Sequence, residues 1–112
     1  MRLPHLRRRL VLEAPERLPD GAGGFSETWL SIGEVWAEVT PLSGREVASG
    51  GGVLSQSAQR IVLRAAPEGS SMRPRPDQRL REGARIFTIL AVTERDQNGR
   101  FLTCITREEV AP

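Results

Sequence analysis

The chain has 112 residues and a formal net charge of +2, with one histidine, one cysteine and 16 basic residues that are all arginine. This length predicts a single domain, residues 1–112, with one modest core. The lone Cys104 excludes an internal disulfide and a thiolate metal cluster. No apolar run approaches the about 20 residues that cross a bilayer, so we expect a soluble chain of cytoplasmic origin with no membrane partner.

The first half of the chain predicts two strands separated by an irregular loop. Residues 8–13 are short and β-compatible, which predicts a first strand. Residues 15–26 hold two prolines, an Asp-Gly pair and a Gly-Gly pair, a density of turn formers that predicts an exposed loop without regular structure. Residues 32–40 alternate apolar and polar side chains, which predicts a half-exposed strand.

The second half predicts three more strands. Residues 43–59 contain four glycines, so they hold at most a short helical turn. The β-branched run 60–64 predicts a third strand, followed by a long basic loop over residues 67–76. Two β-rich runs, 85–93 and 101–106, flank an Asn-Gly pair and predict a hairpin.

This pattern predicts an all-β fold: a small antiparallel β-barrel or sandwich with long flexible loops and at most a short helix. So small a core predicts a marginally stable monomer, which assembly with other copies would help to stabilise. The expected core consists of Leu10, Leu12, Val35, Val39, Ile61, Leu63, Ile86, Ile89, Val92, Leu102 and Ile105.

The search for catalytic chemistry finds no constellation. His5 lies in a charged N-terminal segment and Cys104 in an expected strand, where a buried structural thiol is the better interpretation. The carboxylates Glu34, Glu38 and Glu46 are too dispersed for a metal or acid-base cluster. The chain has no lysine and therefore no phosphate-binding GxxxxGK motif. We expect no enzyme activity, no catalytic residue, no metal and no cofactor.

Two tryptophans and a group of arginines are the candidate binding residues. Trp29 and Trp36 could anchor a protein interface or cap the core. The arginines of residues 7–9 and four arginines assigned to the second loop, Arg73, Arg75, Arg79 and Arg81, could meet phosphate. Nearby acidic residues make a solvated or protein-bound surface an equal alternative. No aromatic side chains interleave with these arginines, which disfavours base stacking on single strands.

The order of these elements resembles a known family. The features are a Leu-Arg-Arg-Arg start at residues 6–9, Gly23-Gly24 before Trp29, the Val-Trp-Ala-Glu-Val run at residues 35–39 with Pro41, Ser-Gly-Arg-Glu at residues 43–46, the strand 60–64, and Gly83 before residues 86–92. Over nearly its whole length the chain resembles the head-tail joining proteins of tailed bacteriophages, including head-closure or stopper proteins of siphophages and gene transfer agents. It departs from that pattern at the three glycines of residues 50–52, which leaves the structure of residues 45–58 open.

The resemblance implies a structural virion protein of the head-tail connector, assembled in the bacterial cytoplasm. Such a protein forms a ring, sixfold in preference to twelvefold, between the portal-adaptor protein and the tail terminator protein, around a channel through which double-stranded DNA passes without sequence specificity. It assigns ring or partner contacts to Trp29, Trp36, Arg45, Glu46 and Arg64. The loop with Arg73 and Arg75 becomes the candidate DNA-channel element, which helps to retain or pass DNA.

Two alternatives stay open at this stage. The chain could be another connector part, an adaptor or a tail terminator, although the lack of long predicted helices disfavours a helical adaptor. It could also be a free nucleic-acid-binding β-barrel of the OB or SH3-like kind, which the basic N-terminal segment permits. Tight binding of short DNA with a steep salt dependence would favour that second alternative.

Overall fold

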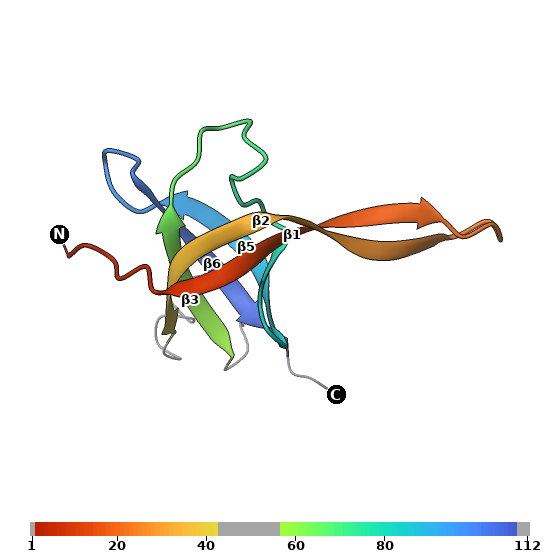
Figure 1. The fold of residues 1–112 in the computed structure, drawn as a ribbon, viewed down its shortest axis with the longest axis horizontal. Coiled ribbons are helices and arrows are strands. Elements are labelled where there is room, and N and C mark those ends of the chain that lie inside the picture. The colour runs from red at the N-terminus through yellow and green to blue at the C-terminus, as the bar shows by residue number, and fades with distance from the viewer. Residues whose placement is uncertain (1, 43–56, 110–112) are drawn as a thin grey trace.

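The computed structural model describes residues 2–42 and 57–109, and these residues form an all-β barrel (Figure 1). Every strand pair is antiparallel, and the sheet closes in the order β1-β2-β3-β6-β5-β4. The described residues contain no helix, so none that could span a membrane. The predicted antiparallel β-barrel is confirmed. Its strands are β1 (Arg8–Pro19), β2 (Phe25–Pro41), β3 (Ala58–Arg64), β4 (Arg79–Glu82), β5 (Arg85–Glu94) and β6 (Phe101–Glu108).

The core fills the barrel with side chains from every strand. Six of the expected residues are fully buried, and Val35, Val39 and Val92 pack partly buried against them. Ile86 and Ile105, also expected in the core, are only half-buried. Alternation explains this error, because Phe87 and Cys104 occupy the inward positions beside them. The central cluster is Leu10, Leu12, Ala37, Ile61, Leu63, Leu80, Phe87, Ile89, Leu102 and Cys104.

The predicted loop over residues 15–26 is wrong, because most of it is strand. β1 continues to Pro19 and β2 begins at Phe25, and β1 pairs along its whole length with residues 25–37 of β2. Only residues 20–24 turn, where the Asp20 carboxylate accepts hydrogen bonds from the backbone of Ala22 at 2.8 Å and of Gly24 at 3.1 Å. Pro15 and Pro19 lack an N–H donor, so they are tolerated only where one edge of a strand is unpaired. β1 meets this condition there, because its second partner, β4, pairs with it only over residues 11–13.

The outer half of this hairpin projects from the barrel as a two-stranded ribbon, shown in orange in Figure 1. We call residues 14–30 the arm. A register shift between Leu12 and Glu13 marks where the hairpin leaves the barrel. From Ala14 to Pro19 the arm extends about 20 Å at the usual rise of a strand. A two-stranded ribbon of this kind has little stability of its own, so it depends on contacts at its base or with a partner.

The second predicted loop is confirmed in part. Residues 65–78 connect β3 and β4 without regular structure, but Arg79 and Arg81 lie in β4, a strand that the sequence did not reveal. β4 pairs with β1 on one side and β5 on the other, and so closes the barrel. The C-terminal hairpin is confirmed, with Gly99 at φ 65° in the turn between β5 and β6.

Candidate functional site

The arm exposes large apolar side chains on both of its faces. Opposite residues of an antiparallel pair share a face, so Leu18 lies with Leu30 on one face and Phe25 with Pro19 on the other. Phe25 is 60% exposed, and Leu18 and Leu30 are exposed as well. The guanidinium of Arg17 lies 4.7 Å from the centre of the Phe25 ring. Apolar surface of this kind on a projecting ribbon is typical of a contact with another protein.

A buried ionic cluster fixes the base of the arm. Glu13 is almost fully buried and accepts hydrogen bonds from Nε of Arg79 at 2.7 Å and Nε of Arg81 at 3.0 Å. Burial by itself would raise the pKa of Glu13, but these two hydrogen bonds lower it below its usual value. The Arg79 guanidinium also stacks on Trp29, 4.0 Å from the ring centre. Trp29 therefore ties the arm to β4.

Trp36 and Arg64 meet at an apolar pocket on the side of the barrel, which we call the Trp36 groove. Its volume is about 290 Å³. Trp36 is 55% exposed, so it does not cap the core. Glu34 and Arg64 lie at its polar rim, and Glu34 forms an exposed ion pair with Arg9 at 3.2 Å. The apolar lining consists of Leu6, Val35, Trp36, Ala65, Ala66 and Met72.

The N-terminal segment forms one wall of this groove and is held in place by Glu38. Two nitrogens of Arg2 donate to the Glu38 carboxylate at 3.0 Å each, and the backbone amide of His5 donates at 2.8 Å. The hydrogen bonds from Arg2 are the largest reason why the pKa of Glu38 falls to about 2. Leu6 is thereby held beside Trp36.

The Glu38 contact predicts a specific pH dependence. Because the pKa is lowered in the folded state, the contact is complete above the ordinary carboxyl pKa of 4.5 and is lost as the pH falls through about 2. We expect the Glu38 carboxyl carbon to titrate near pH 2 in an NMR experiment, with the His5 amide signal shifting in parallel. A Glu38 titration near pH 4.5 would contradict the contact. Glu38→Ala should release the His5 amide already at neutral pH.

The basic loop between β3 and β4 holds Arg73 and Arg75 beside one shallow hollow of about 280 Å³. Arg73 is half-buried and donates from a guanidinium nitrogen to the carbonyl oxygen of Ala66 at 2.9 Å, within its own loop. Arg75 is exposed. Arg75 is therefore more available than Arg73 to bind an anion from solution, whereas Arg73 stabilises the conformation of its own loop.

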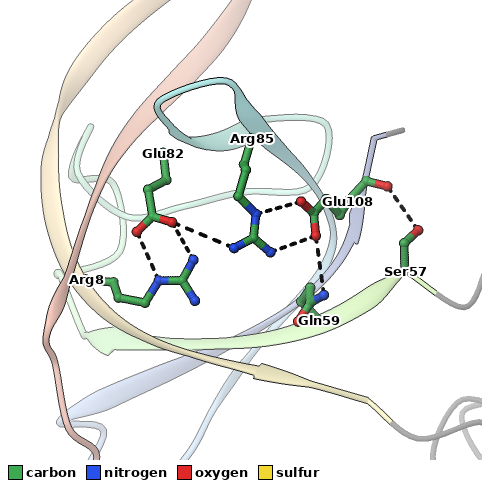
Figure 2. Close-up of polar contacts among 6 residues, drawn as sticks. All are labelled: Arg8, Ser57, Gln59, Glu82, Arg85 and Glu108. Atoms are coloured by element: carbon green, nitrogen blue, oxygen red, sulfur yellow. Dashed lines mark hydrogen bonds and ion pairs between the residues drawn. The ribbon is translucent and has the colours of Figure 1, made fainter. Parts of the chain in front are cut away.

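A polar layer closes the barrel at the end where β6 finishes (Figure 2). The carboxylate of Glu82 accepts a hydrogen bond from Nε of Arg8 at 2.9 Å, and Glu108 accepts two from Arg85 at 2.7 and 2.9 Å. Gln59 joins through its side-chain amide, which donates to Glu108 at 3.4 Å. These arginines lower the pKa values of Glu82 and Glu108. The layer links five of the six strands and occupies inward positions, so its role is structural.

The residues that could carry chemistry are not arranged for it. Burial raises the pKa of Cys104 to about 12, so its thiol is not a nucleophile at neutral pH. Within residues 2–42 and 57–109, no three histidine, cysteine or acidic side chains gather as metal ligands do. What the described surface offers is apolar contact area on the arm and in the Trp36 groove.

Comparison with known proteins identifies the family. A family model described as phage head completion protein matches residues 1–109. The chain belongs to this family. As a phage head completion protein it is a structural component of a virion and not an enzyme, in agreement with the sequence-based expectation.

Solved structures agree with this assignment. A chain in the virion of a native gene transfer agent particle is 48% identical, with 97% of this chain and 100% of that chain covered and a TM-score of 0.74. Protein SF1141 from Shigella flexneri 2a is 24% identical over the full length of both chains, with a TM-score of 0.76, and shows the fold alone. A search of curated proteins found no match.

The interface residues predicted for this head completion protein do not form one site. Trp36 and Arg64 lie together at the groove, whereas Trp29 lies at the base of the arm. Arg45 and Glu46 lie outside the described residues.

Sequence reasoning missed Leu18, Phe25 and Leu30, because their segment was interpreted as a loop. The available signal was the Asp-Gly pair at residues 20–21, which is typical of a hairpin turn, although Pro19 and the glycines of residues 23–24 beside it are unfavourable in strands.

Proposed function

We propose that this head completion protein is the head-closure, or stopper, component of the head-tail connector. It forms a ring between the portal-adaptor protein and the tail terminator protein. The observation that carries this proposal is the pair of exposed apolar surfaces, the arm and the Trp36 groove, on so small a barrel. A protein that works alone has no use for two such surfaces, but a ring subunit buries one against each neighbour.

The charge of the chain suits a channel that DNA must leave again. Each phosphate contact adds to the salt-dependent affinity for DNA, and a ring multiplies every contact by its copy number. A chain with a net charge of +2 avoids a tight grip on the genome. We propose that the loop with Arg73 and Arg75 faces the channel, where the exposed Arg75 makes weak, sequence-independent contacts with double-stranded DNA.

The gene transfer agent relative supports the same place of action. That relative is a virion chain, and this chain shares nearly half of its residues with it over almost the full length. We therefore propose that this chain acts in a phage or gene transfer agent particle, at the junction of head and tail. Six copies in the ring is our proposal, in preference to twelve.

Native mass spectrometry with the neighbouring gene products tests the proposal. We expect the purified chain to enter a defined complex with the portal-adaptor protein or the tail terminator protein, at a fixed copy number. Arg75→Ala should leave this complex intact, because Arg75 is assigned to the channel and not to the ring. A chain that ignores both proteins but shifts on addition of short DNA would support a nucleic-acid-binding barrel instead.

A further inference from the structure

We propose that the arm of one copy binds in the Trp36 groove of the next copy. The inference rests on the proposed ring and names the contact that builds it. Both surfaces expose large apolar side chains, with Phe25 at the tip of the arm and Trp36 in the groove. A groove of about 290 Å³ has room for one or two apolar side chains.

The arm cannot fill the groove of its own chain. Leu6 lines the groove, and the segment that carries it runs along the side of the barrel opposite to the tip of the arm (Figure 1). The arm is a paired ribbon whose base is fixed by Glu13 and Arg79 and whose direction is therefore set. The arm that binds there must therefore come from another molecule, and the arm of a second copy is always present at equal concentration.

Charge supports this pairing. The arm carries Glu16, Asp20 and Glu27 against the single Arg17. Within the described residues neither Glu16 nor Glu27 forms an ion pair.

The groove has the opposite sign. Two charged residues line it, Glu34 and Arg64. Glu34 is paired with Arg9 at 3.2 Å, which leaves the positive charge of Arg64. Acidic side chains of an incoming arm would therefore meet a net positive rim, which favours this orientation of docking and speeds association. The arm itself is a poor partner for DNA, because its acidic side chains repel the negatively charged phosphate backbone.

The contact is of the head-to-tail kind, because the two surfaces differ. A head-to-tail contact repeats from copy to copy and closes into a ring when the rotation allows it. Phe25, which lies at the tip of the arm and is 60% exposed, is the side chain that a groove of this volume can accept. The ring would thus gain buried apolar area at each junction.

A complementation experiment tests the proposal in sedimentation velocity. The arm variant is Leu18→Ser with Phe25→Ser, and the groove variant is Trp36→Ser; all three side chains are exposed, so folding should be unaffected. We expect the wild-type chain to form oligomers with increasing concentration and each variant to stay monomeric. An equal mixture should give a dimer and nothing larger, because one intact arm and one intact groove remain. Leu90→Ser, an exposed apolar site on β5, is the matched control and should assemble as the wild type does.

Three results would overturn the inference: an arm variant that still assembles, a mixture that gives no dimer, or a wild-type chain that remains monomeric up to millimolar concentration. None of them removes the proposed connector function, which depends on where the chain lies in the particle. Conversely, a chain found away from the head-tail junction would end the connector proposal, although the head-to-tail contact could still be measured in solution.

Disulfide trapping gives an independent test. Cys104 is fully buried, so only introduced thiols should react. Oxidation of the double variant Phe25→Cys, Trp36→Cys should give a ladder of covalent oligomers on a non-reducing gel, and either single variant should give monomers. Dimers from Phe25→Cys alone would show that arms contact arms, and would contradict the proposal.

Discussion

Phe87→Ala is expected to lower the free energy of unfolding by about 3–5 kcal/mol. Phe87 is fully buried in the centre of the barrel, so removal of its ring leaves a cavity that the neighbouring strands cannot fill. For a domain of this size the loss is a large share of the total stability. Urea denaturation followed by circular dichroism measures it. A loss below about 1 kcal/mol would contradict the packing of Phe87 in the core.

The matched control is Phe25→Ala, the same substitution on the arm. Phe25 is 60% exposed and its main intramolecular contact is the Arg17 guanidinium, worth about 0.5–1 kcal/mol at an exposed site. We expect its unfolding free energy to fall by less than about 1 kcal/mol, while self-association is lost. The two phenylalanines therefore separate folding from assembly: one substitution destabilises the barrel, and the other leaves a stable monomer.

Glu13→Ala is expected to destabilise the chain by about 2 kcal/mol and to loosen the arm. Breaking a fully buried ion pair costs about 3–5 kcal/mol, and the partial exposure of the Arg81 side chain, 37%, reduces that cost. Loss of Glu13 also leaves Arg79 without the carboxylate that holds it over Trp29. Thermal unfolding measures the first effect, and the backbone relaxation of residues 14–30 by NMR measures the second.

Glu34→Ala is the control for this substitution. Glu34 also pairs with an arginine, Arg9, but the two side chains are 57% and 65% exposed. A surface pair of this kind contributes about 0–1 kcal/mol. An equal loss of stability in the Glu13 and Glu34 variants would show that burial of Glu13 does not matter. Unchanged arm relaxation in Glu13→Ala would show that the ionic cluster does not fix the arm.

The sequence predicted the strands whose signals are local. Alternation identified the inner half of β2, β-branched residues identified β3, and the turn at residues 98–99 identified the β5-β6 hairpin. β4 was missed because it has four residues and a single buried apolar side chain, Leu80, too short for any period to appear. β4 is positioned by its pairing with β1 on one side and β5 on the other, and this pairing exists only once the sheet has closed into a barrel.

The arm was missed for a different physical reason. Prolines usually end strands because they remove a hydrogen-bond donor, and Pro15 and Pro19 were interpreted in that way. A strand with one open edge tolerates them, and whether an edge is open is a property of the tertiary fold. The sequence therefore contained the hairpin turn but not the information that the ribbon leaves the sheet.

The sequence named single candidate contact residues but not the surfaces that they form, and their role in ring contacts stays a prediction. Trp36 and Arg64 were named from the resemblance, and the structure places both at one groove. The remaining apolar wall comes from Leu6, Ala65 and Met72, whose positions in the sequence give no sign that they meet. Trp29 was assigned to the same class of ring or partner contacts, and the structure places it at the base of the arm, stacked on Arg79.

A cryo-EM reconstruction of the intact particle tests the central claim most directly. We expect density for this barrel as a ring at the head-tail junction, between the portal-adaptor protein and the tail terminator protein, with the arm of each copy against its neighbour. Density for the chain anywhere else in the particle, or as an isolated copy without ring neighbours, would contradict the connector function proposed for it.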